Sequence, residues 1–203
     1  IRPEFEEIDL TDGEVTRDFF ARHSDIRAVI HFAALKAVGE SVNKPLEYYF
    51  NNLNSLMNVL TCMREFKVPN LVFSSSCTVY GQADVLPVTE KTPRHEAESP
   101  YGNTKVMSED IIRDLMRVEP DMKALALRYF NPIGAHPTAF IGELPNGLPN
   151  NLIPYLTQTA IGIREQLSVF GDDYNTPDGS PLRDYIDVVD LAQAHVVAIR
   201  RLL

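Results

Sequence analysis

The sequence has little cysteine, with two residues among 203. Cys62 and Cys77 offer no metal-ligand spacing and no disulfide framework, so we expect neither a metal site nor a disulfide-stapled domain. Cys62 lies in an apolar helical pattern and is expected in the core. Cys77 has no recognisable base partner, which a nucleophilic thiol would need.

Long apolar runs and an excess of basic residues are also missing. No run reaches the roughly 20 residues that span a bilayer, and no secretory signal opens the chain, so we expect a cytoplasmic location. The sequence holds 19 Lys and Arg against 28 Asp and Glu, a net charge of −9. Nucleic acids and anionic membranes reward clustered cations, and neither is expected as a partner. A bound phosphate must therefore be held locally, by a few cations or helix N-termini.

What the chain does contain is a regular alternation of apolar patterns. Strand-like runs at 27–34, 70–76 and 123–130 alternate with helical patterns at 44–66 and 101–117. This alternation predicts an α/β fold, a doubly wound parallel sheet with right-handed crossovers. The other expected elements are a strand at 7–10, helices at 11–22 and 155–164, strands at 166–170 and 183–187, and a final helix from 190.

The texture changes after residue 134. Glycine and proline punctuate a long irregular segment at 134–151, and such segments are commonly binding loops or lids. We therefore predict two domains. The first comprises residues 1–131, to which 184–203 return, and the second comprises residues 132–183.

One group of polar residues indicates chemistry. The strand expected at 70–76 ends in serines, the last of which is Ser76. Ser99 and Pro100 are good helix starters, and they place Tyr101 and Lys105 four apart on one helical face. An ammonium group near a phenol favours the phenolate, a general base, and a serine could share the proton. A Tyr-x-x-x-Lys tetrad alone is usually a solvated helix face, so the preceding serine carries the prediction that Ser76, Tyr101 and Lys105 are catalytic.

This group resembles the extended short-chain dehydrogenase/reductase family, in its sugar-nucleotide 4-epimerase branch. The resemblance rests on FSSSCTVYG at 73–81 followed by SPYG at 99–102, and it runs from Asp9 to Leu203. It implies a Rossmann-type fold in which residues 1–131, with 184–203, form an NAD-binding domain. It also implies that residues 132–183 form part of a substrate-binding domain. It also implies a homodimer formed through helices 46–66 and 101–117.

The resemblance also implies the binding residues. Those expected to bind the cofactor are Asp9, Leu10, Phe32, Ala33, Ala34, Leu35, Lys36, Asn51, Ser76, Tyr101, Lys105, Tyr129 and Phe130. Those expected to bind the substrate are Ser76, Tyr101, Asn131, Asn151, Leu152, Ser168, Val169, Phe170 and Arg183. Small residues after a parallel strand let a ligand approach the backbone, and an arginine fork suits a diphosphate.

The implied activity is an isomerase of galactose metabolism, with UDP-hexose as substrate. It inverts C4 of the hexose in UDP-glucose and UDP-galactose, using NAD and a 4-keto intermediate. Two alternatives stay open. A dehydratase or decarboxylase of the same superfamily would need an added acid/base pair near Ser76. A nucleotide-binding regulatory protein would bind without turnover.

A glycine-rich dinucleotide turn is also missing from the sequence. In such sheets it precedes the helix whose N-terminus holds the pyrophosphate. The resemblance therefore implies that this unit precedes Ile1 and that more substrate domain follows Leu203. We expect residues 1–203 alone to be an inactive internal fragment that binds NAD poorly.

Overall fold

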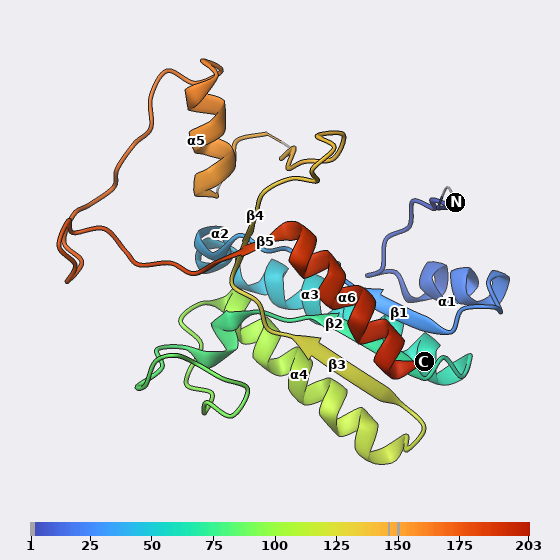
Figure 1. Ribbon diagram of the computed structural model, residues 1–203. Helices are drawn as coiled ribbons and strands as arrows, with labels where there is room; N and C mark the ends of the chain where they lie inside the picture. The colour runs from blue at the N-terminus through green and yellow to red at the C-terminus, as the bar shows by residue number, and fades with distance from the viewer. Residues whose placement is uncertain (1–2, 146, 150) are drawn as a thin grey trace. The chain divides into compact units, whose positions relative to one another are not determined.

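The computed structural model describes residues 3–145, 147–149 and 151–203 (Figure 1). The chain forms two compact units. The first contains Ile1–Arg128 and His195–Leu203, and the second contains Tyr129–Ala194. Their assignment to cofactor and substrate binding stays a prediction.

The first unit is built on a parallel sheet, as the alternating pattern predicts. Its strands are β1 (Ala28–His31), β2 (Asn70–Ser74) and β3 (Lys123–Leu127), in the order β1-β2-β3. In the register, Val29 pairs with Leu71, and Leu71 pairs with Ala124. Every residue of β2 is buried, which is expected of a central strand with both faces covered.

Helices cover both faces of this sheet (Figure 1). Leu71 and Phe73 point to one face, in the core shared with α1 (Gly13–Arg22), α3 (Pro45–Glu65) and α4 (Pro100–Val118). Val72 points to the other, where it packs with Ala198 and Leu202 of α6 (Val188–Leu202). Because alternate residues of one strand reach helices on opposite sides, the doubly wound α/β prediction is confirmed.

Two short helices lie in the connections. They are α2 (Val38–Asn43), between β1 and α3, and the 3-10 helix η1 (Cys77–Tyr80), directly after β2. The sequence pattern predicts neither of them. Both are shorter than two turns of an α-helix, so they leave almost no periodic signal.

The helix starts follow the local sequence. The Asp12 carboxylate caps α1 by accepting from the Glu14 and Val15 amides at 3.0 and 3.1 Å. Ser99 Oγ accepts from the Gly102 amide at 3.1 Å, and Pro100 occupies the first turn of α4. Both contacts satisfy donors that a helix end leaves unpaired. The predicted start at Ser99 is confirmed.

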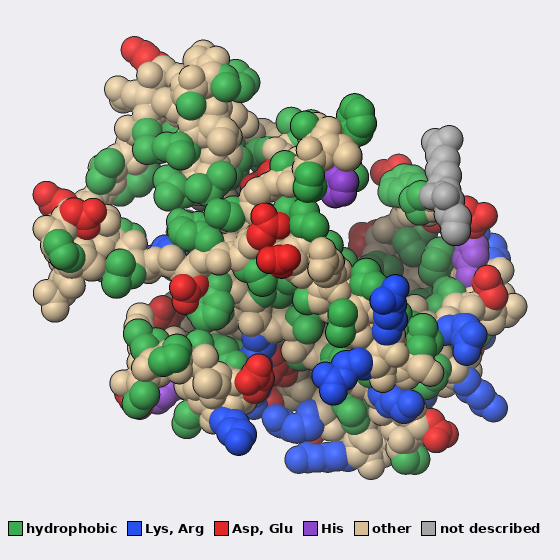
Figure 2. Space-filling view, in the orientation of Figure 1, with side chains coloured by type: hydrophobic (Ala, Val, Ile, Leu, Met, Phe, Trp, Pro, Cys, Tyr) green, Lys and Arg blue, Asp and Glu red, His purple; other side chains and the backbone are tan. Residues whose placement is uncertain are grey.

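The acidic chain has a local gathering of cations. Lys and Arg side chains collect over α4 and α6 in Figure 2. Arg117 lies in the last turn of α4, and Arg200 and Arg201 lie in the last turn of α6, where a positive charge complements the helix macrodipole. Among the residues that the structure describes, no helix is both long and apolar enough to cross a membrane.

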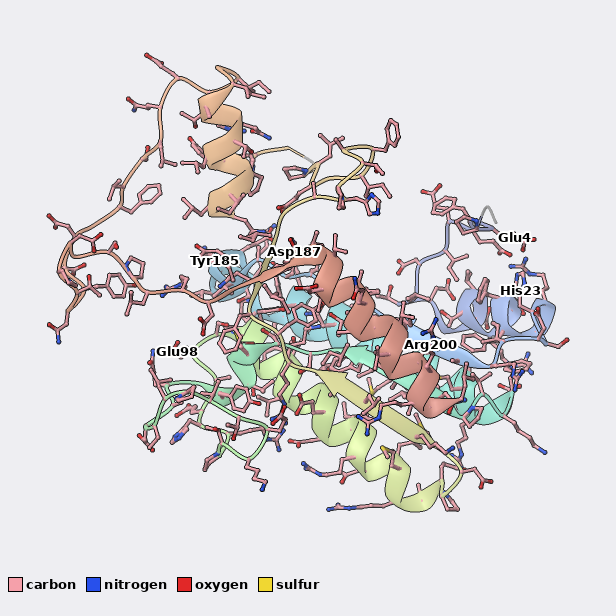
Figure 3. The ribbon with its side chains drawn as sticks, in the orientation of Figure 1. Glu4, His23, Glu98, Tyr185, Asp187 and Arg200 are labelled. Atoms are coloured by element: carbon pink, nitrogen blue, oxygen red, sulfur yellow. The ribbon has the colours of Figure 1, made fainter. Side chains whose placement is uncertain are left out.

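The second unit contains a parallel pair of short strands, β4 (Asn131–Ile133) and β5 (Tyr185–Asp187), and the helix α5 (Leu152–Ala160). Figure 3 labels Tyr185 and Asp187 on β5. Gly134 follows β4 with φ +98°, a conformation that favours glycine. The Asp187 carboxylate accepts from the Val189 amide at 2.7 Å, which helps to start α6.

Two expected strands are wrong. Residues 7–10 form no strand, because a strand needs a neighbouring backbone. Side chains of α3 hold this stretch instead, with Asn58 Nδ2 donating to the Leu10 carbonyl and Asn54 Nδ2 to the Thr11 carbonyl, each at 2.9 Å. Residues 166–170 form no strand either, and Phe170 at their end is 99% exposed. Alternation without a buried face does not fix a strand.

Other expected bounds shift by a few residues. The run at 123–130 gives a strand only through Leu127, and Asn131 begins β4 where the sequence predicts a stop. The helix expected at 155–164 is α5, which begins at Leu152 and ends at Ala160. Parallel pairing with β5 is a long-range contact, so the local pattern around Asn131 does not reveal it.

The buried stripe of α3 generates a stability prediction. Val59 is 3% exposed in the core, and Val118, at the end of α4, is 69% exposed. In urea unfolding of the intact protein, Val59→Ala should lower the free energy of unfolding by about 2 kcal/mol, because buried methyl groups are lost. Val118→Ala makes the same chemical change and should stay within about 0.5 kcal/mol of the parent. Equal losses in both variants would contradict this core.

Candidate active site

The site is organised where α4 meets the end of β2. Lys105 is 5% exposed, and its Nζ donates to the Ser74 carbonyl at 2.7 Å. The same Nζ lies 4.9 Å from the centroid of the Phe73 ring and 5.8 Å from that of the Tyr101 ring. The helix therefore brings the ammonium group and the phenol together at the exit of the strand.

Ser76 lies at the same junction. It is 8% exposed, and its Oγ accepts from the Thr78 amide at 3.2 Å, capping η1. The first turn of α4 packs on η1, since a Cβ added to Gly102 would lie 3.4 Å from Thr78 Cβ. Gly81 ends η1 with φ +56°, and a Cβ there would approach the Glu96 carbonyl to 2.6 Å, so only glycine fits. Ser76, Tyr101 and Lys105 thus belong to one β2–η1–α4 junction.

The charges at this junction are set by burial. Desolvation lowers the pKa of Lys105 from its usual 10.5 to about 8. Burial, followed by the charge of Lys105, lowers the pKa of His31 to about 4. The His31 ring stacks on Phe73 with centroids 6.1 Å apart. At neutral pH His31 is therefore neutral and Lys105 carries the positive charge.

The segment after β1 leaves the sheet at the same edge. Strands β1 and β2 are parallel, so their carboxyl ends lie at the same edge of the sheet. Phe32–Lys36 follow the carboxyl end of β1, and Ser75 and Ser76 follow that of β2. Open α/β sheets bind ligands at this edge. Phe32 is 56% exposed. Ala33 and Lys36 are exposed and Ala34 is half-buried, which leaves a small-residue backbone and one cation facing solvent. These groups suit a dinucleotide pyrophosphate.

A clamp that the sequence does not predict holds this segment. Asn52 is 4% exposed; its Oδ1 accepts from the Leu35 amide at 2.7 Å and its Nδ2 donates to the Leu35 carbonyl at 3.0 Å. The same Nδ2 donates to Thr104 Oγ1 at 3.1 Å. Asn52 therefore joins the segment after β1 to α4. The only sequence signal is an amide pair in an apolar helical stripe.

Two neighbours complete the clamp. Asn51, the predicted cofactor contact, is half-buried, and its Nδ2 donates to Asn52 Oδ1 at 3.0 Å. Tyr48 is fully buried, and its Oη accepts from the Ala37 amide at 3.1 Å and donates to Glu40 at 2.9 Å. Burial raises the pKa of Tyr48 to about 12, so it stays a phenol.

The predicted contacts near the N-terminus are partly open to solvent. Asp9 is exposed, and its Oδ1 accepts from the amide and hydroxyl of Thr11, both at 2.8 Å. These bonds lower the pKa of Asp9, which keeps it an ionised acceptor. Leu10 is half-buried.

The remaining predicted residues lie in the second unit. Asn131 Nδ2 donates to the carbonyl of Asp184, the residue after Arg183, at 2.9 Å. Arg183 is exposed, with Nη1 donating to the Leu182 carbonyl at 2.8 Å. Asn151 precedes α5 and donates to Glu143 at 3.4 Å. The others are exposed (Leu152, Ser168, Val169 and Phe170) or half-buried (Tyr129 and Phe130).

Comparison with known proteins gives the class first. The model of the NAD dependent epimerase/dehydratase family matches residues 1–202. The chain therefore belongs to the NAD dependent epimerase/dehydratase family, and the resemblance carried by 73–81 and 99–102 is confirmed.

Its relatives are more specific. The chain is 55% identical to a UDP-glucose 4-epimerase of Mus musculus and 54% identical to one of Bacillus subtilis, each over 98% of this chain. A crystal structure of the Bifidobacterium longum UDP-glucose 4-epimerase in complex with NAD⁺ and UDP matches with a TM-score of 0.93 and 48% identity, over 96% of this chain and 58% of that one. The chain spans 57% of the mouse protein and 58% of the Bacillus protein.

The buried lysine generates a pH prediction. Between pH 8 and 10.5 the unfolded chain keeps a proton on Lys105 that the folded chain has released. The contribution of Lys105 to the free energy of unfolding should therefore rise with pH across this window, by ~3 kcal/mol. Below pH 8 the full destabilisation from burying this charge is present. Urea unfolding of the intact protein at several pH values measures this slope.

The matched comparison isolates the contribution of Lys105. Lys105→Met should remove the share of the slope between pH 8 and 10.5 that comes from this position, because methionine does not titrate. Lys91 is exposed in the 81–98 loop, so Lys91→Met should keep the parental rise in stability between pH 8 and 10.5. A parental slope in Lys105→Met would show that another group titrates.

Proposed function

We propose that the intact protein inverts C4 of the hexose in UDP-glucose and UDP-galactose, with NAD as cofactor. The observation that carries the proposal is the junction of Tyr101 with a buried Lys105 at the end of β2. The mouse and Bacillus UDP-glucose 4-epimerases are identical to this chain at more than half of the positions compared, over nearly its whole length. The Bifidobacterium enzyme, which has a similar fold, forms a complex with both NAD⁺ and UDP.

Groups of both units fit the two ligands. In the first unit, Asp9 and Leu10 would contact the adenosine part of NAD, and Phe32–Lys36 and Asn51 would line the rest. Lys36 supplies a cation for the pyrophosphate, and the ionised Asp9 is an acceptor for hydroxyl or amino groups. In the second unit, Asn131, Asn151 and Arg183 would hold the UDP portion, because an arginine fork and amide donors match a diphosphate and a uracil ring.

The chemistry belongs to Tyr101. Its phenolate takes the proton of the sugar 4-hydroxyl, and Ser76 shares that proton through a hydrogen bond. The Lys105 ammonium group stabilises the phenolate from the buried side. NAD held by the residues named above would supply the acceptor and later the donor of the C4 hydride, which would make a 4-keto sugar the intermediate. Firm contacts on UDP and weak ones on the hexose let the keto sugar present its other face.

The dehydratase alternative needs a further acid or base beside Ser76. Ser75 and Cys77 flank it. The nearest carboxylate along α4 is Glu109, which is already engaged with the Arg128 guanidinium at 2.6 and 2.9 Å and with the Ser75 hydroxyl at 2.6 Å. Incubating the intact protein with UDP-galactose decides between the functions. An epimerase forms UDP-glucose without net NADH, a dehydratase releases a dehydrated keto sugar, and a regulatory protein forms neither.

Removing the phenolic oxygen of Tyr101 tests its role as the base. Tyr101→Phe should lower kcat for UDP-galactose by about 10²–10⁴-fold while substrate binding stays parental, because the proton acceptor is lost and the ring is kept. Steady-state kinetics and calorimetry with UDP measure the two effects. Tyr49→Phe, which removes a phenol bonded to Asn103 between α3 and α4, is the control and should keep kcat. Near-parental turnover in Tyr101→Phe would reject this residue as the base.

We also propose a homodimer formed through α3 and α4. These helices pack side by side and expose apolar side chains, including Leu46 at 80%, Phe50 at 66% and Met107 at 40%. Exposed apolar groups on adjacent helices favour a self-complementary contact across a twofold axis.

The cytoplasmic location expected from the sequence stays a prediction.

The dimer is tested with introduced charge. Phe50→Glu should yield monomers in sedimentation velocity, because a buried unpaired carboxylate at an interface costs several kcal/mol. Val85→Glu makes a comparable change at a 72% exposed position in the 81–98 loop and should leave the sedimentation coefficient unchanged. A dimer that survives Phe50→Glu would place the interface elsewhere.

A further inference from the structure

We propose that Glu109 is a positioning residue that fixes Ser76 through the hydroxyl of Ser75. The inference rests on the proposed function, in which Ser76 shares the substrate proton. Ser75 is 1% exposed, and its Oγ donates to Glu109 Oε1 at 2.6 Å. The hydrogen bond acts on the residue directly before Ser76.

The helix α4 reaches this segment from three successive turns. Tyr101, Lys105 and Glu109 are spaced four apart, so they share one face of the helix. Lys105 donates to the Ser74 carbonyl and Glu109 accepts from the Ser75 hydroxyl. The tyrosine that would take the proton and the two side chains that hold the serine segment are therefore carried by the same rigid element. Such an arrangement keeps the geometry of reacting groups within narrow limits.

The backbone of Ser75 is held as well. Its amide lies 3.0 Å from the Leu127 carbonyl at the end of β3 and 3.0 Å from the Phe73 carbonyl. With the side chain fixed by Glu109, Ser75 has few rotations left. The position of the next residue, Ser76, is consequently set by β3 on one side and by α4 on the other.

The charge of Glu109 is balanced inside the protein. Arg128 donates to it from Nε at 2.9 Å and from Nη2 at 2.6 Å, and the same guanidinium lies 5.0 Å from the Tyr80 ring centroid. Arg94 Nη1 from the 81–98 loop is 3.7 Å from Glu109 Oε2. Glu109 itself is 8% exposed. Buried ion pairs are weak contributors to stability, so a role in fixing one local geometry is a better reason for this one.

The test breaks only the bond between Ser75 and Glu109. In the intact protein, Ser75→Ala leaves the Glu109–Arg128 pair complete, so the buried charges stay compensated. We expect kcat for UDP-galactose to fall about 10-fold with KM unchanged, because the bond orients the proton-sharing serine and does not touch the UDP. The control is Ser41→Ala, which removes another fully buried hydroxyl with a 2.6 Å bond, in α2, and should keep kcat.

A double-mutant cycle separates positioning from structure. If Ser75 acts through Ser76, adding Ser75→Ala to Ser76→Ala should lower kcat no further, while the stability cost of Ser75→Ala should persist. Glu109→Asp keeps the charge but shortens the side chain, and it should lower kcat as Ser75→Ala does, without adding to it. Losses that multiply in either cycle would overturn the proposal.

The other possible outcomes also decide whether Glu109 and Ser75 position Ser76. A parental kcat in Ser75→Ala would overturn the positioning role while the parent stays an epimerase. A rise in KM with unchanged kcat would overturn it too, because it would indicate substrate binding. A parent that forms no UDP-glucose would reject the proposed function itself, a result that the parental assay gives before any variant is made.

Discussion

The bond from Lys105 to the Ser74 carbonyl is the constraint on which the junction depends. It holds an ammonium group in a buried place, where desolvation disfavours the charge and lowers the pKa to about 8. The carbonyl oxygen and the rings of Phe73 and Tyr101 compensate in part for this burial. Burial, followed by the charge of Lys105, lowers the pKa of His31 to about 4, so this neighbour adds no second positive charge. The bond therefore fixes the positions of the end of β2, the Lys105 ammonium group and the Tyr101 phenol relative to one another.

The same logic extends to the loops that this junction borders. Functional segments on loops need support from rigid elements, because loop backbone alone does not fix a side chain. Asn52 from α3 holds both backbone groups of Leu35, and Glu109 from α4 holds Ser75. Asn52 also bonds Thr104, so the two supporting helices are tied to each other. A displacement of either helix would therefore disturb both segments together.

The sequence predicts this architecture well where local rules decide it. The cap at Ser99, the proline after it and the four-residue spacing from Tyr101 to Lys105 are all local, and the structure has α4 where they place it. Arg128 follows Glu109 by 19 residues and reaches it only through the fold, so no spacing rule reveals the pair. The expected strand at 7–10 failed for a related reason, since strand formation depends on a neighbour that a local pattern does not contain.

The ion pairs also bear on how an acidic chain would hold the two diphosphates of the proposed function. Arg17, Arg22 and Arg128 are engaged with Glu65, Glu6 and Glu109, so their charges are already balanced. Within residues 3–145, 147–149 and 151–203, Lys36 and Arg183 are among the cations that pair with no carboxylate, and both are exposed. An anion that meets such a cation does not have to displace a carboxylate, so more of the interaction is left for binding. A net charge of −9 gives phosphates no long-range attraction, so in the proposed function their affinity would come from these few contacts and from helix N-termini.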